Sequence, residues 1–378
     1  MNKKKVKILG SGPTGSLLAI SLASKNCNVV LIDPLSDSSL FAKDKGYAIT
    51  QSSRKIFENL GLWSEIEKYA LGFNSLSIID DELSQSVIIR GSDLKKFNKD
   101  QIYIGWVIEH KFLMKIFLDA VNANKFIDKV NQNATEDKFF DFILAADGRD
   151  SSTREDWGIK YHKRFYKQRC ISFRAILKGA PSKRAYEIFR FEGPLALLPL
   201  EKEIYQVIWF SKSSEAKSRL RLSESKLLEK LSSILPEEIT AETIVSEVSN
   251  YSVAQAFALP KFNNFNKVLV GDSAHSFHPV GGQGLNSCIR DVFELRNMIL
   301  DYDNSPKTSR KIFSITFFLN RFTDIISLLI FTDFLIKLFS NKQRILYPLR
   351  SLIFYMLRKI KILRVNVFSL MTDSIKRY

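Results

Sequence analysis

The sequence GDSAHSFHPVGGQGLN, at residues 271–286, decides the fold of this chain. It follows a short apolar run at residues 267–270, typical of a buried strand, and opens a helix-period segment at residues 285–300. A strand, an acid and a glycine-rich turn that begins a helix present backbone amides and a positive dipole end to an electron-rich ligand. Asp272 can accept a hydrogen bond from a sugar or polyol hydroxyl, and Gly281, Gly282 and Gly284 let the backbone approach a flat ring. The pattern therefore predicts a ligand site at this turn.

This stretch resembles the second flavin-binding motif of the FAD-dependent aromatic hydroxylases, the class A flavoprotein monooxygenases. The family pattern is G-D-A-A-H, three variable residues, P, two more residues, then G-Q-G-x-N, and this chain departs from it only at Ser273, where Ala is usual. The resemblance implies contacts with FAD from seven residues of the motif. They are Asp272, Pro279, Gly281, Gly282, Gly284, Leu285 and Asn286.

The N-terminal segment carries a dinucleotide-binding fingerprint in the context that it requires. An apolar strand at residues 6–9 precedes GSGPTG at residues 10–15, and a helix at residues 16–24 and a strand at residues 28–32 follow. The turn brings the backbone close to a pyrophosphate, and the acid after the second strand suits an adenosine ribose. By itself the signature serves NAD and FAD equally. The cofactor-binding residues expected here are Gly10, Gly12, Pro13, Thr14, Gly15 and Asp33.

Two further segments match the family in chain order. The apolar strand at residues 140–145 runs into DGRDSSTR, which resembles the D-G-x-x-S-x-x-R motif and assigns Asp147, Gly148 and Arg154 to the cofactor site. We expect Arg154 to neutralise pyrophosphate or nicotinamide-cofactor phosphates, whereas Ser151 is equally compatible with an ordinary helix cap.

Lys45 stands where the family has Arg. A lysine keeps the positive charge of that arginine but lacks the planar guanidinium that binds an anion through two hydrogen bonds. A solvated surface lysine without a role in the site is an equally good interpretation.

The segment around residues 106–110 resembles the family's return to the cofactor domain, ahead of an amphipathic helix at residues 111–122. Glu109 is a candidate for a position near the flavin, and His110 is expected to make local hydrogen bonds. The pair His275 and His278 has no third ligand nearby, so no metal site is predicted.

Alternating, β-rich composition predicts strands at residues 76–89, 170–179, 185–191, 204–211 and 244–259, with a helix at residues 223–235. Between two of these strands, GPLALLPL at residues 193–200 resembles the ubiquinone-biosynthesis ring hydroxylases, a branch of the same family. Physically this apolar, proline-bounded strand could wall a hydrophobic substrate site. A plain core strand would look the same.

The charge of the chain is concentrated at its C-terminal end. The formal net charge is +16 over 378 residues, and residues 341–378 hold nine Lys or Arg against one Asp, which is +8. Residues 317–364 interleave Phe-rich apolar runs with cations, and Pro348 should break or kink them. These helices could lie in a membrane interface or pack as a pair on the cofactor domain with a solvated cationic face. No nucleic-acid recognition module is recognisable.

The remaining composition predicts a globular protein in a reducing compartment. The 45% apolar content predicts a globular chain of one large or two intermingled domains, and Cys27, Cys170 and Cys288 are expected to be isolated thiols in a reducing compartment. No secretory h-region and no run of about 18 apolar residues is present, so we expect a cytoplasmic protein, peripheral at the inner face of the membrane if the tail binds lipid.

Taken together, the resemblance implies an α/β fold with a Rossmann-like FAD-binding domain of the glutathione-reductase type and an interleaved antiparallel substrate sheet. The expected FAD-binding segments are residues 1–75, 106–165 and 255–310; the substrate domain is residues 76–105 and 166–254; basic amphipathic helices occupy residues 311–378.

The implied reaction is hydroxylation of a polyprenylated phenol on the ubiquinone route. FAD is reduced by NAD(P)H and reacts with O2 to a C4a-hydroperoxide that transfers one oxygen atom. No side chain is assigned as a catalytic base, and the choice between NADH and NADPH stays open. Two alternatives remain: an FAD-dependent prenyl-lipid reductase or dehydrogenase, and a non-catalytic flavin-binding scaffold of a biosynthetic complex.

Overall fold

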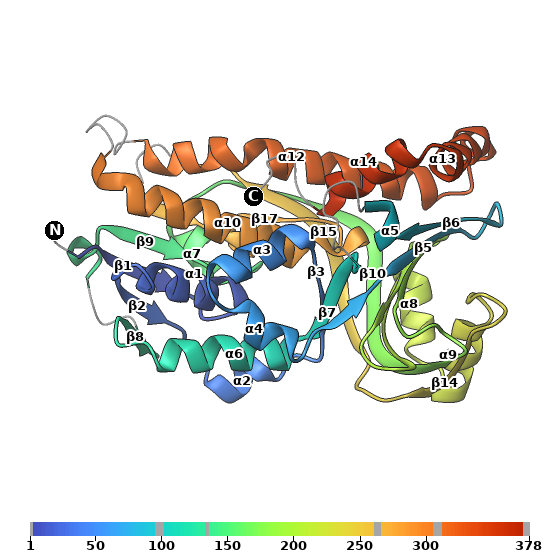
Figure 1. The fold of residues 1–378 in the computed structure, drawn as a ribbon, viewed down its shortest axis with the longest axis horizontal. Coiled ribbons are helices and arrows are strands. Elements are labelled where there is room, and N and C mark those ends of the chain that lie inside the picture. Colours follow the sequence, from blue (N-terminus) through green and yellow to red (C-terminus); the bar gives the residue numbers. More distant parts are fainter. Residues whose placement is uncertain (1–2, 95–101, 133–135, 261–265, 305–311, 373–378) are drawn as a thin grey trace.

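Two β-sheets stand at opposite ends of an elongated molecule, joined by strands and by one long helix (Figure 1). This computed structural model describes residues 3–94, 102–132, 136–260, 266–304 and 312–372. Residues 1–2, 95–101, 133–135, 261–265, 305–311 and 373–378, which belong to several of the predicted segments, lie outside that description. The three cysteines are buried and free, as the sequence predicts.

The first sheet is parallel, with strand order β16-β9-β1-β2-β8. Its strands are β1 (Lys5–Leu9), β2 (Asn28–Ile32), β8 (Ile127–Val130), β9 (Phe142–Ala145) and β16 (Lys267–Leu269). Helix α1 (Pro13–Ala23) contacts both α6 (His110–Asn122) and α10 (Gln283–Leu300). The central strands β1, β2 and β9 consist largely of Val, Ile, Leu and Phe because both faces of a parallel sheet are covered. Helix α1 begins three residues before the predicted start, since Pro13 has the fixed φ of a first helical position.

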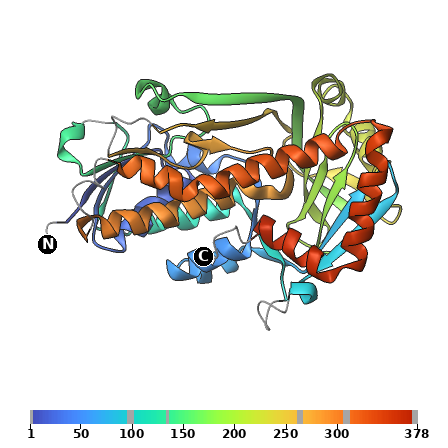
Figure 2. The ribbon, with the colours of Figure 1, turned by 90° about the horizontal axis from the view of Figure 1, so that it is seen from above.

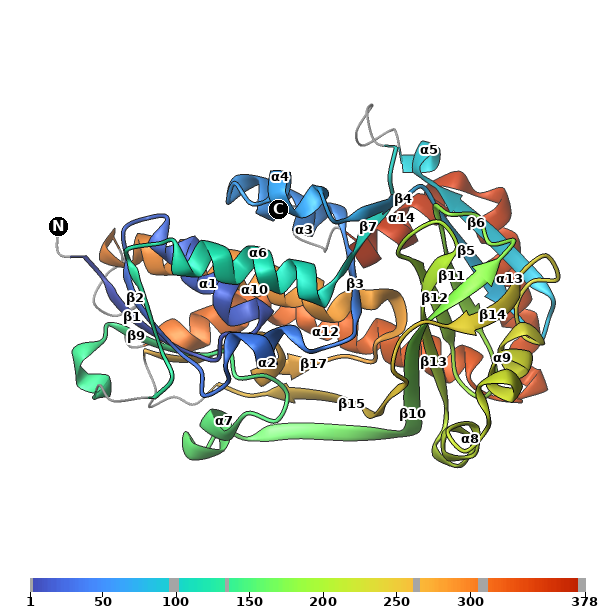
Figure 3. The same ribbon diagram turned by 90° about the horizontal axis from the view of Figure 1, so that it is seen from below.

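The second sheet is mostly antiparallel, in the order β17-β15-β10-β13-β12-β11-β5-β6, with β14 paired to β10. Its strands are β5 (Ser75–Asp80), β6 (Gln85–Arg90), β10 (Tyr161–Lys178), β11 (Arg184–Phe189), β12 (Leu195–Pro199), β13 (Ile204–Lys212), β14 (Thr240–Ile244), β15 (Ser249–Ala258) and β17 (His275–Ser276). Strand β10 begins nine residues before the predicted strand. Figure 3 shows it leaving the parallel-sheet end and turning into the antiparallel sheet, where its register with β15 shifts.

Short elements connect the two sheets. A three-stranded sheet consists of β3 (Gly46–Ile49), β7 (Gly105–Glu109) and β4 (Leu71–Phe73). The shorter helices are α2 (Asp37–Phe41), α3 (Gln51–Asn59), α4 (Trp63–Glu67), α5 (Gly91–Leu94), α7 (Ser152–Asp156), α8 (Ser213–Arg219) and α9 (Glu224–Ser232). Helices α8 and α9 contribute to the core of the antiparallel sheet together with β10, β12 and β13.

The C-terminal segment forms three helices rather than the predicted pair: α12 (Phe313–Phe339), α13 (Tyr347–Lys359) and α14 (Lys361–Thr372). Pro348 lies in the first turn of α13, so the chain breaks before it, at residues 340–346. Helix α12 runs beside α10 and continues toward the antiparallel sheet, where α13 contacts β6 (Figure 2). The tail therefore packs on both halves of the molecule. Among the described helices, none is long and apolar enough to cross a bilayer.

A buried ion pair fastens this segment to the antiparallel sheet. The guanidinium of Arg350 on α13 donates from Nε to Asp80 Oδ2 on β5 at 2.8 Å, and both side chains are fully buried. Such a pair fixes where α13 docks, because either charge alone in this interior would be costly.

Candidate active site

The ends of four parallel strands bring the predicted cofactor residues to one edge of the sheet. Leu9, the last residue of β1, is the register partner of both Ile32 on β2 and Ala145 on β9, and Ala145 is in turn paired with Leu269 on β16. The loops that follow these residues contain Gly10, Asp33, Asp147 and Asp272. The carboxyl edge of a parallel sheet is where α/β folds bind their ligands, so the three motifs converge as predicted.

The glycine turn at residues 10–15 packs tightly against the sheet at Gly10 and Gly15 and is open at Gly12. Gly10 has a φ of +99°, and a Cβ there would lie 2.6 Å from the Ala146 carbonyl oxygen; a Cβ on Gly15 would lie 1.8 Å from the Gly10 oxygen. A Cβ on Gly12 would meet no atom within 4 Å. Helix α1 starts here with Pro13 and has no side-chain cap, which leaves its first amides available to an anion.

Asp33 closes this turn from the next strand. Its Oδ2 accepts a hydrogen bond from the Ser11 amide at 2.6 Å, and its Oδ1 accepts from the Leu35 amide at 2.9 Å. The side chain is buried, and two amides orient its carboxylate while further lone pairs remain. This position suits the ribose contact that the fingerprint predicts.

In chain order the three motifs are residues 10–15, 147–154 and 271–286, and the second of them presents an incompletely hydrogen-bonded acid to the same edge. Asp147 Oδ2 accepts from the Thr153 amide at 3.1 Å, whereas its Oδ1 is buried with no hydrogen-bond partner. Gly148 has a φ of +88°, and a Cβ there would lie in open space. Ser151 caps α7 by accepting from the Arg154 amide at 3.0 Å, which confirms the helix-cap alternative. An orphaned carboxylate oxygen beside open glycines is the arrangement expected of a polar ligand site.

Arg154 acts as a brace between the second and third motifs. Its Nη1 donates to the Ser273 carbonyl at 2.9 Å, its Nη2 donates to the Arg149 carbonyl at 3.2 Å, and its guanidinium lies 3.6 Å from the centre of the Tyr161 ring. The side chain is buried. These protein contacts occupy the guanidinium that the sequence assigned to a phosphate.

The third motif is anchored to the sheet through Ser273, the one departure from the family pattern. Its hydroxyl donates to the Ala145 carbonyl at 2.7 Å and accepts from the Val270 amide at 3.0 Å. An alanine could make neither bond, so the serine gives this chain an extra tie between β9 and the turn. Asp272 itself remains exposed, within 3.6 Å of the Cys288 sulfur.

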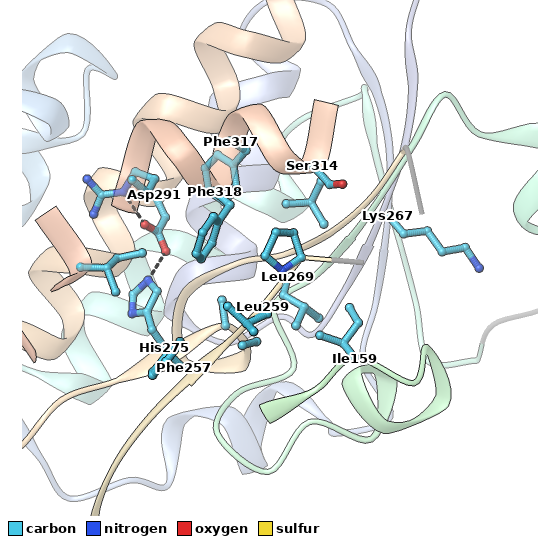
Figure 4. A pocket seen from close by; sticks show the side chains of 16 residues that line it. Ile159, Phe257, Leu259, Lys267, Leu269, His275, Asp291, Ser314, Phe317 and Phe318 are labelled. Carbon is cyan, nitrogen blue, oxygen red and sulfur yellow. Dashed lines mark hydrogen bonds and ion pairs between the residues drawn. The ribbon is translucent and has the colours of Figure 1, made fainter. Parts of the chain in front are cut away.

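A buried cluster of Asp291, His275 and Arg321 supports the same turn on its protein side (Figure 4). Asp291 accepts from His275 Nε2 and from Arg321 Nε, both at 2.6 Å, and from the Gly271 amide at 3.0 Å. Burial alone would raise the pKa of Asp291, but its interactions with His275 and Arg321 hold that pKa well below its usual range. Because Arg321 belongs to α12, the C-terminal segment supports the cofactor turn directly.

The two histidines of the H-x-x-H pair are both used inside the protein. His278 donates from Nε2 to Gln168 Oε1 at 3.1 Å and accepts from the Val280 amide, and burial lowers its pKa to about 3. His275 is bonded to Asp291. Among the residues that the structure describes, no three His, Cys, Asp or Glu side chains form a group that could hold a metal.

The start of α10 is the most open part of the third motif. Pro279 leads into Gly281 and Gly282, which have left-handed φ values of 74° and 63°. No side chain caps the helix, and a Cβ on Gly284 would meet nothing within 4 Å. The amides of Gly284 and Leu285 lie in this first turn and have no intrahelical partner. The turn can therefore stabilise negative charge on a flat ring that lies against the glycines.

Asn286 positions this helix from within. Its Oδ1 accepts from the Thr50 amide at 3.0 Å and from Ser53 Oγ at 2.7 Å, while its Nδ2 donates to the carbonyls of Ala48 and Gly282. The side chain is fully buried. Its side-chain polar atoms therefore join α10 to β3 and α3. A contact of Asn286 with the cofactor would have to come from its backbone.

Lys45 is exposed at the surface, in line with the surface-lysine alternative, and its ammonium is 5.0 Å from the centre of the Tyr47 ring. His110 accepts from the Tyr47 hydroxyl and donates to the Leu40 carbonyl, as the sequence predicts.

Glu109 pairs with Arg174 at 2.7 Å and also with Lys111, so its carboxylate joins β7 to β10. The carboxylate predicted to lie near the flavin is thus part of an ion pair between two sheets.

A large apolar cavity of about 370 Å³ opens beside the glycine turn. The turn residues Gly281 and Gly282 form one wall, strands of the antiparallel sheet form a second, and the helices α12, α13 and α14 form the third. In the stretch GPLALLPL, Ala196 and Leu198 line the cavity while the alternate residue Leu197 lies in the core, so this strand contributes to an apolar cavity and to the core.

The sequence did not identify two parts of this cavity. One is Glu187 on β11. In the sequence it could have been noticed as an acid at a position of an alternating strand where an apolar, inward-facing residue is expected. The other is the wall of Phe and Leu side chains from the tail.

The comparison with family models finds one that matches most of the chain. The model described as FAD binding domain matches residues 3–82 and 122–302. These ranges include all three motifs and the strand ends that carry them.

Curated relatives are similar over most of their length. Ubiquinone hydroxylase UbiL of Rhodospirillum rubrum is 26% identical, with 89% of this chain and 82% of the relative covered. The 3-demethoxyubiquinol 3-hydroxylase of Escherichia coli is 22% identical, with 78% of this chain and 79% of the relative covered. Among solved structures, p-nitrophenol 4-monooxygenase PnpA of Pseudomonas putida has a TM-score of 0.78 at 15% identity, covering 97% of this chain and 96% of that protein. This last likeness establishes the fold.

Proposed function

This chain belongs to the FAD-binding domain family, and we propose that it is an FAD-dependent monooxygenase that hydroxylates the aromatic ring of a polyprenylated phenol in ubiquinone biosynthesis. The relatives named as ubiquinone hydroxylases support this class of substrate. NAD(P)H and O2 are the co-substrates. Bound FAD supplies the redox chemistry, accepting a hydride from NAD(P)H and activating O2.

The observation that carries the proposal is the apolar cavity beside the glycine turn. Its volume of about 370 Å³ lies in the range of small-molecule sites, and its lining is almost entirely aliphatic and aromatic. An aromatic head group at Gly281 and Gly282 would lie against the flavin ring, and an isoprenoid chain would extend between α12 and α13. A polar or charged substrate would find almost no partner along this wall.

The residues at the carboxyl edge of the sheet fit FAD as the cofactor. The uncapped start of α1 and the open position at Gly12 would bind the pyrophosphate, and Asp33 the adenosine ribose. The unpartnered oxygen of Asp147 would accept a hydrogen bond from the cofactor. The remaining contacts are proposed for the glycine turns and their neighbours: Gly10, Pro13, Thr14, Gly15, Lys45, Gly148, Asp272, Pro279, Gly281, Gly282, Gly284 and Leu285.

Two residues of the predicted set are proposed to support the cofactor indirectly. Arg154 holds the second motif against the third, and Asn286 fixes the start of α10. The domain limits expected from the sequence are retained as a proposal.

The protein's own contribution is to bind, orient and exclude water. The amides at the start of α10 stabilise charge on the electron-rich edge of the ring, and the apolar walls keep solvent from the reacting atoms.

We also propose that the C-terminal helices rest on an anionic membrane surface. Large apolar side chains are exposed on all three helices, including Ile330, Leu352 and Ile362, and at Ile345 in the turn before α13. The segment from residue 341 carries a formal charge of +8. Phe334 is half-exposed and also lines the cavity, which gives a lipid-borne chain a route inward.

Co-sedimentation with vesicles tests the membrane contact. Binding should be strong to phosphatidylglycerol vesicles, weak to phosphatidylcholine vesicles, and lost when Ile345 and Leu352 are both replaced by Glu. Equal binding by the double variant would contradict this docking face.

The reaction itself is tested with purified protein, NAD(P)H, 2-octylphenol and isotopically labelled O2. A monooxygenase consumes O2 in response to the phenol and yields a hydroxylated ring that carries one labelled oxygen atom. A reductase would give product without the label, and a scaffold would give neither; either result would refute the proposed function.

A further inference from the structure

One acid interrupts the apolar surface of the cavity. Along β11, Ala185, Tyr186, Glu187 and Phe189 line the cavity, whereas Ile188 belongs to the core of the antiparallel sheet. The register partners of Glu187 are Ala196 on β12 and Ile78 on β5, both of which also line the cavity. The carboxyl is therefore surrounded on its own sheet face by hydrocarbon.

This carboxyl has an oxygen without a partner. Glu187 is 9% exposed, and its Oε1 is buried with no hydrogen-bond partner. Burial raises its pKa to about 8, and the backbone of Gly281 acts in the opposite direction. Buried polar groups in native proteins are nearly always hydrogen-bonded, so an unpaired carboxyl in a cavity is a candidate for contact with a ligand.

The contact with Gly281 also locates the group. Gly281 belongs to the glycine turn against which the flavin ring is proposed to lie, so Glu187 stands where the cavity meets that ring. A head group bound there has its polar substituent at Glu187 and its apolar chain directed toward the C-terminal helices.

We propose that Glu187 is a catalytic residue that accepts a hydrogen bond from the ring hydroxyl of the substrate. The inference rests on the proposed function and deepens it, since it specifies a free phenolic hydroxyl as the feature that is recognised. An alkyl aryl ether or a plain alkylbenzene would leave the buried carboxyl unpaired and would bind less well.

The same contact can activate the ring. When the phenolic O–H bond breaks, the electron pair stays on the ring oxygen and the proton moves to Glu187 Oε1; the proton returns to the product oxygen afterwards. Ionisation raises electron density at the ring carbons, which favours attack on an electrophilic oxygen. The step needs the carboxylate form, so hydroxylation should increase as the pH rises through the pKa of Glu187, about 8.

Few other groups can produce that pH dependence. Of the described residues that line the cavity, two have titratable side chains, Glu187 and Tyr186. Strands β5 and β12 and the three C-terminal helices contribute apolar linings. At the end of β5, Asp80 does not line the cavity and is paired with Arg350.

Two variants separate the hydrogen bond from the proton transfer. Glu187→Gln keeps a hydrogen-bonding amide that cannot accept the proton, and Glu187→Leu removes both functions. Both should fold at least as stably as the natural protein, because an unpaired buried carboxyl is removed; denaturant unfolding checks this.

The probes are 2-octylphenol and octylbenzene, titrated calorimetrically into the FAD-loaded protein. We expect the natural protein to prefer the phenol by about 10-fold, Glu187→Leu by less than about 2-fold, and Glu187→Gln by an intermediate factor. The rate of phenol hydroxylation should rise between about pH 7 and pH 9 in the natural protein and stay flat in Glu187→Gln.

The outcomes distinguish the two proposals. Equal preference for the phenol in the natural protein and in Glu187→Leu, or an unchanged pH profile in Glu187→Gln, would overturn the role of Glu187 alone. Failure of the natural protein to bind and hydroxylate 2-octylphenol would overturn the proposed function together with this inference.

Discussion

Replacement of Asp291 by Asn tests how the cofactor turn is held. The carboxylate of Asp291 accepts from His275, Arg321 and the Gly271 amide, and the side chain is 1% exposed. Asparagine has nearly the same shape but no charge, and one of its two terminal atoms is a donor. The substitution therefore removes one acceptor and leaves Arg321 with less negative charge nearby.

The expected loss of unfolding free energy depends on the partners that Arg321 keeps in the variant. Breaking a buried ion pair from one side costs about 3–5 kcal/mol. Arg321 retains a second carboxylate, since its Nη2 lies 2.7 Å from Asp324 Oδ2, so the loss should be near the lower limit, about 3 kcal/mol. The Gly271 amide also loses its acceptor, and we expect FAD to bind at least about 10-fold more weakly.

Urea unfolding of the flavin-free protein measures the stability, and quenching of flavin fluorescence measures the affinity. Asp119→Asn, on the exposed side of α6, serves as the control and should change neither quantity. An unfolding free energy within about 1 kcal/mol of the natural value for Asp291→Asn, with unchanged FAD affinity, would refute the reasoning.

Acid provides a second readout. Because the pKa of folded Asp291 is lowered, its contribution is complete above the ordinary Asp value of about 3.9 and is lost as the pH falls toward the folded value. Asn at this position has no carboxyl to protonate, so the variant should lose less stability than the natural protein between about pH 4 and pH 2.

Two further substitutions test the other braces. Arg154→Lys loses the two-carbonyl fork and the stacking on Tyr161, so urea unfolding should show a loss of about 1–3 kcal/mol; no loss would mean that the guanidinium is not a brace. Asp80→Asn leaves Arg350 buried without its carboxylate, at a cost of about 3 kcal/mol, and limited proteolysis should then cut within α13 more readily. Unchanged proteolysis of that helix would show that its docking does not depend on the ion pair.

The sequence predicted the local parts of the fold well because their signals are local. The strand, glycine turn, helix and strand of residues 5–32 follow from apolar periodicity and from Gly10 and Pro13. Convergence of the three motifs also followed, since parallel strands end at a common edge. The start of α1 moved by three residues because of Pro13, and the start of the long bent strand β10 moved by nine.

Contacts between residues far apart in the sequence determine the side-chain roles and the tail packing that the sequence did not predict. Arg154 and Asn286 occur within cofactor motifs, yet their polar atoms contact protein groups contributed by distant segments. The tail was recognisably amphipathic, but nothing in its pattern indicated that it would wall the cavity. Glu187 had a usable signal, a charge at an inward strand position beside Ala185 and Phe189, which became meaningful only once the cavity was visible.

The central claim is that open glycine turns at one sheet edge hold FAD, and Gly12 tests it most directly. A Cβ at this position meets no protein atom within 4 Å, so Gly12→Ala should leave the unfolding free energy of the flavin-free protein within about 1 kcal/mol of the natural value. The measurement is a fluorescence titration of FAD into both flavin-free proteins. We predict binding of one FAD per chain by the natural protein and at least about 10-fold weaker binding by Gly12→Ala. Equal affinity in the two proteins, or no binding by the natural protein, would contradict the account.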